Sequence, residues 1–201
     1  MITVGITGGS GSGKSTAARF LVQKGAKCID ADLVYHSLIE KPSDCTRALS
    51  REFGASVLTA DGALDRRALS EIVFAPTDAG RSALARLNEI THHYVQKECE
   101  KQLEAFRETN VPVTVLDVPL LFESGMDKLC NVTLAFIASK KIRLARIIKR
   151  DGITKEAAEA RIAAQPSDEY YKECADHVIE NNGNKEELQR SLSHLLPKIM
   201  R

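Results

Sequence analysis

Short apolar runs and longer amphipathic stretches alternate along most of the chain. The first run, Ile2 to Thr7, has the pattern of a buried strand, and the stretch after it places apolar residues on one side of a helix. Similar short runs recur later, at 26–29, 111–116, 131–137 and 176–180. Strands that alternate with helices predict a parallel sheet covered on both faces. We therefore expect an α/β fold with a five-stranded parallel sheet flanked by helices.

Local signals predict where several helices begin and end. Gly25 suits the left-handed residue that ends the first helix, and Asp65 suits the N-cap of a helix over 66–74. Pro76 and Thr77 open the next helical stretch. Further helices are expected at 139–150, at 154–164 and after Asn184, whose spacing to Glu187 resembles a capping box.

The segment from Leu33 to Arg107 is mostly helical in pattern, with breaks at Pro42 and Asp61-Gly62. It is too long for a simple crossover between two strands. We interpret it as a helical insertion over the ligand edge of the sheet, which is a natural place to bind an acceptor. Four of its residues are candidates for that role, although each alone is more typical of a solvated surface: Arg66, Arg67, His92 and His93.

Composition excludes several classes of protein. The 201 residues are 43% hydrophobic and 27% charged, as in an ordinary globular protein with one good core and a smaller appendage. A net charge of +1 gives no reason to expect nucleic acid or a membrane surface as a partner. The five cysteines form no C-x-x-C pair, so we expect them to be reduced thiols in the cytoplasm with no metal-binding or redox role. Met1 leads directly into a strand, so we expect no signal peptide.

A glycine-rich segment separates the first strand from the first helix. Gly8, Gly13, Lys14 and Ser15 match the phosphate-binding pattern G-x-x-x-x-G-K-[ST]. Glycines let successive N–H groups turn inward around a phosphate, and the following helix adds its unpaired N–H groups. In such loops the lysine contacts the β- and γ-phosphates and the hydroxyl ligates Mg²⁺. We expect a nucleoside triphosphate to be bound by Gly8, Gly11, Ser12, Gly13, Lys14, Ser15 and Thr16.

Carboxylates follow two of the predicted strands. Asp30 and Asp32 come directly after the second strand, and Asp117 ends the third. Either residue of the first pair could simply cap the helix that begins near Leu33. Because open α/β sheets place ligands at the carboxyl ends of their strands, we expect at least one of the two to face Mg²⁺ or the acceptor hydroxyl. Asp117 follows four apolar or β-branched residues. This pattern is a weak signature of the second nucleotide-binding motif, in which the aspartate holds Mg²⁺ directly or through water.

The helix predicted over 139–150 is strongly basic. Such charge usually marks a solvated helix face. Here it follows a strand of a sheet that carries a phosphate-binding loop, which favours an arginine-bearing flap that closes on a triphosphate. Arg146 and Arg150 are the candidates.

With these residues in place, the chain resembles the dephospho-CoA kinase family over essentially its whole length. Ile-Asp-Ala-Asp at 29–32 and Asp-Val-Pro-Leu-Leu-Phe-Glu at 117–123 carry most of the specificity, because the phosphate loop is shared by a vast superfamily. Further matching segments are 61–69, 146–151, 161–165, 175–176 and 182–183. Two positions depart from the family pattern: His93, where proline is usual, and Tyr171, where a basic residue is expected and Lys172 is adjacent.

The resemblance implies a kinase that transfers the ATP γ-phosphoryl to the ribose 3′-hydroxyl of dephospho-CoA, giving coenzyme A and ADP. It implies Asp32 and Arg146 as catalytic residues, with Arg150 as a further lid arginine that contacts the nucleotide. The loop and strand patterns add Lys14 as a catalytic residue and Ser15 with Asp117 as Mg²⁺ ligands. The partners are then ATP and dephospho-CoA, with the protein a monomer or weak homo-oligomer. Adenine contacts are expected from the turn at 181–183 and from the lid. The implied domains are a nucleotide-binding core (1–32, 110–138 and 175–201), an acceptor-binding domain (33–109) and a lid (139–174).

Other functions share part of this pattern. A kinase of a nucleoside monophosphate or another small hydroxyl acceptor would have the same loop and lid and differ in the 33–107 segment. A GTP-binding switch would need an Asn-Lys-x-Asp segment, which the sequence lacks. An ATP-binding module without transfer activity would show no acceptor-dependent release of ADP.

Overall fold

The computed structural model describes residues 1–199 of the chain. Contacts within the chain divide it into two compact units, and each is described by itself. The first unit contains Met1–Ile29 and the chain from Phe106 onward, and the second contains Asp30–Ala105. Within residues 1–199, no helix is long and apolar enough to cross a membrane.

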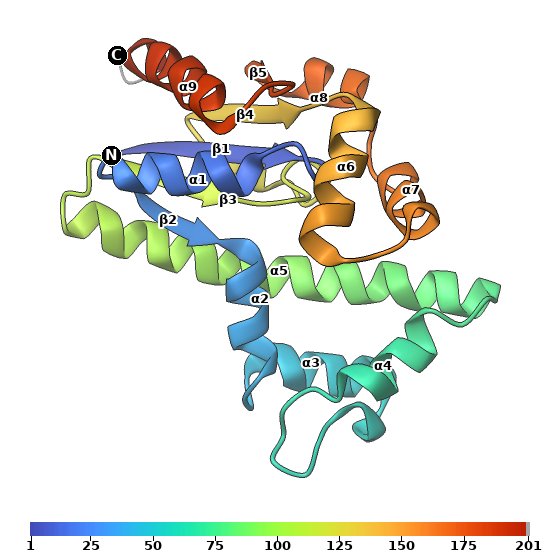
Figure 1. Cartoon of the computed structure of the whole chain (residues 1–201). Coiled ribbons are helices and arrows are strands. Elements are labelled where there is room, and N and C mark those ends of the chain that lie inside the picture. Colours follow the sequence, from blue (N-terminus) through green and yellow to red (C-terminus); the bar gives the residue numbers. More distant parts are fainter. Residues whose placement is uncertain (200–201) are drawn as a thin grey trace. The chain divides into compact units, whose positions relative to one another are not determined.

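A five-stranded sheet forms the centre of the first unit (Figure 1). Its strands are β1 (Ile2–Gly8), β2 (Lys27–Asp30), β3 (Val113–Asp117), β4 (Val132–Ile137) and β5 (His177–Glu180). Their spatial order is β2-β3-β1-β4-β5; β1 pairs in parallel with both of its neighbours, and β4 pairs in parallel with β5. The predicted five-stranded parallel sheet is confirmed.

Helices cover both faces of this sheet, as the near-continuous apolar strands require. On one face, α1 (Lys14–Gln23) and α9 (Lys185–Ile199) pack in one apolar cluster with alternate residues of β1 and β4. On the other face, Tyr171 of α8 (Asp168–Cys174) packs against Ala135 and Ile137. Two further helices, α6 (Lys140–Asp151) and α7 (Lys155–Ala163), and a short 3₁₀ turn, η2 (Met126–Leu129), complete the unit.

The second unit is helical, as predicted, and has a core of its own. It contains α2 (Ala31–Ile39), α3 (Asp44–Phe53), the 3₁₀ turn η1 (Ala55–Val57), α4 (Arg66–Val73) and most of α5 (Asp78–Glu108). The buried residues of its apolar cluster come from α2, α3, η1, α4 and the loop before α4: Ile39, Cys45, Leu49, Val57, Leu64, Leu69 and Val73. The second unit thus has an apolar cluster separate from that of the sheet.

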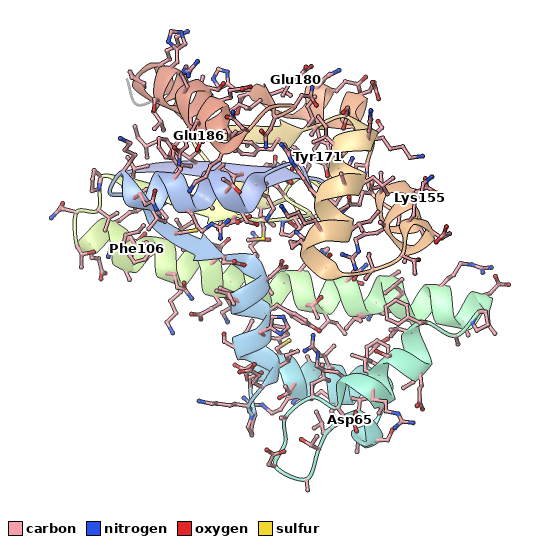
Figure 2. All side chains as sticks on the ribbon, in the orientation of Figure 1. Asp65, Phe106, Lys155, Tyr171, Glu180 and Glu186 are labelled. Carbon is pink, nitrogen blue, oxygen red and sulfur yellow. The ribbon has the colours of Figure 1, made fainter. Side chains whose placement is uncertain are left out.

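The predicted helix ends agree closely with the observed ones. Gly25 has φ +99°, and the Asp65 side chain accepts hydrogen bonds from two N–H groups of α4 (Figure 2). The Asn184 side chain accepts from the N–H of Glu187 at 2.9 Å. One helix, α8, was not predicted, because Ser167 opens it after a segment with no clear apolar period. The predicted core segment 175–201 ends with two residues that lie outside the described ones.

A hydrogen-bonded pair ties the start of β5 to β4. Asp176 accepts from the N–H of Thr133 at 2.8 Å and from its hydroxyl at 2.7 Å. The N–H of Asp176 donates back to Thr133 Oγ1 at 3.0 Å. These bonds, led by the one from the hydroxyl, lower the pKa of Asp176. The pair thereby positions the strand that leads into the 181–183 turn.

Thr133→Val should lower the free energy of unfolding by about 1–2 kcal/mol at neutral pH, since it removes the hydroxyl and keeps the shape. Because folding lowers the pKa of Asp176, its stabilisation is present above the unfolded pKa, about 4, and is lost as pH falls through the lower folded value. The difference in the free energy of unfolding between Thr133→Val and the unsubstituted protein should therefore become smaller at acid pH. Urea unfolding at pH 7 and at acid pH measures it; a difference independent of pH would contradict the role of the carboxylate.

Candidate functional site

The glycine-rich loop joins β1 to α1, as the sequence predicts. Gly13 is the N-cap of α1 and has φ +105°, a conformation that an L side chain rarely adopts. Its carbonyl accepts the N–H groups of Thr16 and Ala17, at 2.9 and 3.0 Å, which starts the helix. The unpaired N–H groups of the first turn of a helix attract anions.

Three successive carbonyls of the loop are held by side chains from outside it. Those of residues 10–12 accept from Arg143 Nε at 3.0 Å, Arg146 Nη1 at 3.1 Å and Asn181 Nδ2 at 2.7 Å, respectively. In a planar peptide unit the carbonyl and the following N–H point in opposite directions. Holding the carbonyls against the surrounding protein therefore turns the N–H groups of Gly11 and Gly13 away from these donors, as a phosphate nest requires, while the N–H of Ser12 donates to the Gly9 carbonyl at 3.0 Å.

Lys14 and Asp117 form an ion pair. Asp117 ends β3 beside β1, where it aligns with Ile6, and its side chain is only 6% exposed. Lys14 is partly buried at the start of α1. The structure thus brings together the predicted phosphate-binding lysine and the predicted Mg²⁺ ligand.

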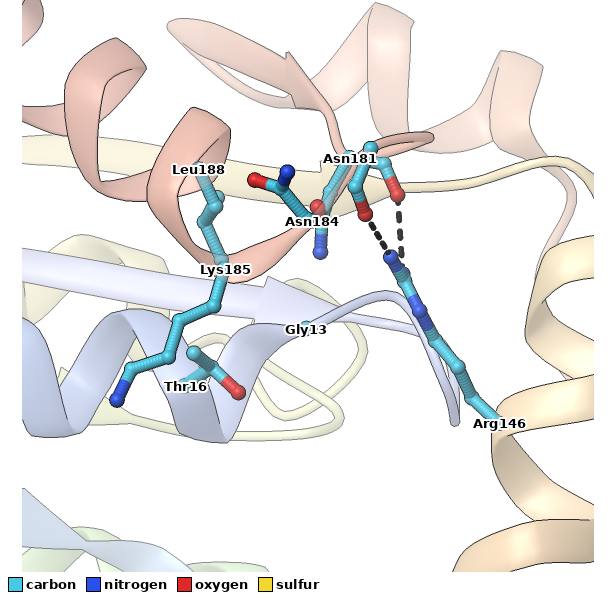
Figure 3. A pocket seen from close by; sticks show the side chains of 8 residues that line it. Gly13, Thr16, Arg146, Asn181, Asn184, Lys185 and Leu188 are labelled. Carbon is cyan, nitrogen blue, oxygen red and sulfur yellow. Dashed lines mark hydrogen bonds between the residues drawn. The ribbon is translucent and has the colours of Figure 1, made fainter.

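A pocket of about 250 Å³ opens beside the loop (Figure 3). It is lined by Gly13 and Thr16 from the loop and α1, by Arg146 from α6, and by Asn181, Gly183, Asn184, Lys185 and Leu188 from the C-terminal part of the chain. The lining combines polar groups with one large apolar side chain, that of Leu188.

Arg146 connects this pocket to the loop. Its guanidinium donates to the carbonyl of Gly11 at 3.1 Å. It also donates to the carbonyls of Asn181 and Gly183, at 2.9 and 2.7 Å (Figure 3). Burial lowers its pKa. Because the acceptors are neutral carbonyls, the positive charge keeps no carboxylate partner among these contacts and adds to the field at the loop.

Arg150 has a different environment. Its guanidinium makes two bonds to the Asp151 carboxylate, at 2.6 and 2.9 Å, and Arg161 contacts the same group. The hydrogen bond from Arg150 is the main cause that lowers the pKa of Asp151 to about 2. The expected nucleotide contact of Arg150 stays a prediction.

In the second unit, Asp30 and Asp32 lie in different environments. Asp30 is the N-cap of α2, and its Oδ1 accepts from the N–H groups of Asp32 and Leu33 at 2.9 and 3.2 Å. Asp32 lies exposed in the first turn. The alternative left open by the sequence is thereby decided: Asp30 is the capping residue.

Sequence reasoning missed Arg143 and Gln165, both of which contact the loop. A signal for Arg143 existed: it precedes the fully buried Ile147 by one helical turn, and a charge in a buried stripe is rarely without a specific partner. Tyr171, where the family pattern expects a basic residue, is 2% exposed in the core, and burial raises its pKa to about 12. It cannot supply a basic contact.

Asn181→Asp should lower the free energy of unfolding by about 1–3 kcal/mol, because a carboxylate oxygen would replace the only side-chain donor to the buried Ser12 carbonyl among the described contacts. The matched control is Asn182→Asp. Asn182 accepts from the N–H of Ser139 at 2.8 Å through Oδ1, which a carboxylate retains, so its effect should stay within about 0.5 kcal/mol. Denaturant unfolding measures both; equal losses would contradict the role of Asn181.

Comparison with known proteins yields one consistent result. The family model described as dephospho-CoA kinase matches residues 2–187. A dephospho-CoA kinase of Lactobacillus johnsonii is 38% identical over 198 residues, covering 98% of each chain. A crystal structure of a Thermus thermophilus protein has a TM-score of 0.79 at 33% identity, covering 98% of this chain and 97% of that one.

A dephospho-CoA kinase structure from Campylobacter jejuni has a TM-score of 0.71 at 25% identity, covering 98% of this chain and 96% of that one. The family model and the relatives match the chain over nearly its whole length, which includes the phosphate loop. The chain belongs to the dephospho-CoA kinase family.

Proposed function

We propose that this protein phosphorylates the ribose 3′-hydroxyl of dephospho-CoA with ATP, releasing coenzyme A and ADP as the final step of coenzyme A biosynthesis in the cytoplasm. The observation that carries the proposal is the phosphate loop of a chain of this family. Side chains of the surrounding protein bind its carbonyls on the side away from the expected phosphate, and Lys14 follows the loop directly. Such a loop recognises a triphosphate, and the relatives are named for the acceptor.

The loop would hold the β- and γ-phosphates of ATP through its N–H groups, the N-terminus of α1 and the Lys14 ammonium group. One buried hydroxyl supports this role: Ser12 Oγ has no hydrogen-bond partner within residues 1–199. Buried polar groups are rarely left unsatisfied, so a group without a partner in the loop favours a ligand there.

The pocket beside the loop would take the adenine ring. It lies between α1 and the 181–183 turn, next to Arg146. Asn184 and Lys185 offer polar groups at its edge. The position of the pocket supports the proposal that this turn and the lid contact the base.

The residues present fit Mg²⁺. Ser15 and Asp117 offer oxygen ligands, and no cluster of three or more metal-binding side chains exists within residues 1–199. That pattern suits a cation held chiefly by substrate phosphates and water, with one or two protein ligands. When bound, Mg²⁺ neutralises developing charge on the phosphates. Asp117 would then exchange its contact with Lys14, which is drawn to the phosphates.

Asp32 would orient the acceptor hydroxyl and take its proton late in an in-line transfer. A loose, metaphosphate-like transition state demands little base strength, so position matters more than pKa. Arg146 would stabilise charge on the transferring group; its guanidinium has five N–H donors, of which the described bonds use three. The lid, 139–174, would exclude water from the reaction.

The acceptor is the part of the proposal most open to direct measurement. With ATP and Mg²⁺, the protein should release ADP rapidly with dephospho-CoA and at a small fraction of that rate with nucleoside monophosphates or shikimate. Phosphorylation at the 3′-hydroxyl can be read by mass spectrometry of the product. ADP release that is fastest with a nucleoside monophosphate would favour the alternative kinase, and no acceptor dependence would favour a binding module.

Asp32→Asn should reduce phosphoryl transfer by about 10²- to 10⁴-fold while the Kd for ATP stays within about twofold, because the loop is untouched. Asp30→Asn is the matched control: asparagine caps a helix as well as aspartate does, so activity should be retained. Steady-state kinetics and calorimetry measure the two quantities. Near-normal turnover of the Asp32 variant would show that the acceptor is oriented by another group.

A further inference from the structure

Ser10 lies in the middle of the phosphate loop, and two residues distant in sequence form hydrogen bonds with its N–H, its hydroxyl and its carbonyl. Its N–H donates to Gln165 Oε1 at 2.9 Å, and its hydroxyl accepts from Gln165 Nε2 at 3.1 Å. Its carbonyl accepts from Arg143 Nε at 3.0 Å. Both backbone groups and the side chain of Ser10 are thus satisfied from outside the loop.

Arg143 and Gln165 also hold each other. Arg143 Nη2 donates to Gln165 Oε1 at 2.6 Å, so that oxygen accepts from two donors and the orientation of the amide is determined. The pair acts as one unit that connects α6 and the segment after α7 to the loop. Removing either residue deprives the other of one hydrogen bond.

Arg143 is an unusual cation because it is nearly buried, at 5% exposed. The nearest carboxylate is Asp168, whose oxygen lies 3.9 Å from Nη1, at the limit of an ion pair. The guanidinium packs so closely over the loop that a Cβ at Gly9 would overlap it. A buried charge with only a distant counterion is costly, and a polyphosphate in the adjacent loop would supply the missing negative charge.

Arg143 is absent from the lining of the pocket proposed for the base. Its contacts are with the loop, with Gln165 and with Asp168. This separates it from Arg146, which lines that pocket. These contacts all lie within the first unit, so a change at Arg143 should affect recognition of the phosphates and not of the base.

We propose that Arg143 and Gln165 are positioning residues that fix Ser10 and so preassemble the loop for a nucleoside triphosphate, with the Arg143 charge adding to its attraction for the phosphates. The inference rests on the proposed function, because it concerns the ATP site of the same reaction.

The test compares Arg143→Met, Gln165→Ala and the double variant with the unsubstituted protein. Each single change should raise the Kd and the KM for ATP at least about tenfold, the effect of losing a charged or paired hydrogen bond. The KM for dephospho-CoA should stay within about twofold. Because the two residues act as one unit, the double variant should lose little more than the weaker-binding single variant.

Lys149→Met is the matched control, because it removes a positive charge from an exposed position of the same helix. Its Kd for ATP should match that of the unsubstituted protein. Circular dichroism and thermal melting check that each variant is folded; if Arg143→Met does not fold, Gln165→Ala alone decides the question. Arg143→Lys keeps the charge without the fork of donors and should recover only part of the affinity.

Unchanged ATP binding in Gln165→Ala and in folded Arg143→Met would overturn this inference and leave the proposed function intact. Lowered thermal stability of these variants with an unaltered KM for ATP would do the same. Losses that multiply in the double variant would overturn the claim that the two residues act together. No ATP binding by the unsubstituted protein would overturn the proposed function and this inference with it.

Discussion

The first unit depends on one constraint: the carbonyls of the phosphate loop must have donors on the side away from the phosphate. A nest of inward N–H groups leaves the oxygens pointing into the protein, where an unpaired carbonyl costs about 1–3 kcal/mol. Arg143, Arg146 and Asn181 supply the three donors. The strand order makes this possible, because β4 and β5 lie to one side of β1 and lead into α6 and the 181–183 turn.

The charges of the site follow from this arrangement. Two arginines bind neutral carbonyls, so their positive charge is largely uncompensated by those contacts. Lys14 is paired with Asp117. A triphosphate arriving with Mg²⁺ would take over Lys14 and give the aspartate a new cation, so neither member of the pair would be left buried and alone. An exchange of partners costs far less than the creation of an unpaired charge.

Much of the fold could be predicted from the sequence because its signals are local. The strands are short apolar runs, and the caps at Gly25, Asp65 and Asn184 need only their neighbours in the chain. The phosphate loop was equally visible, since its glycine spacing is a backbone requirement. The resemblance to a family added the acceptor, which no local pattern contains.

The rest depended on contacts between distant segments. Gln165 meets Ser10 across 155 positions, and no spacing rule predicts that pair. Which of Asp30 and Asp32 caps α2 could not be decided either, because both residues suit an N-cap and the helix start was uncertain by a residue or two. Arg150 was a candidate because it lies on a basic helix that follows a strand of the phosphate-binding sheet. In the structure its guanidinium is hydrogen-bonded to the Asp151 carboxylate.

A loop held by side chains from α6, from residue 165 and from the end of β5 has already lost its conformational freedom when the chain folds. A nucleotide arriving at such a loop need not order it, so association can be fast and the heat-capacity change small. The reverse also holds. Local unfolding of α6 on warming would remove the hydrogen bonds to the loop while the sheet is still folded. The highest temperature at which the protein is active would then be set by this local unfolding and not by global unfolding.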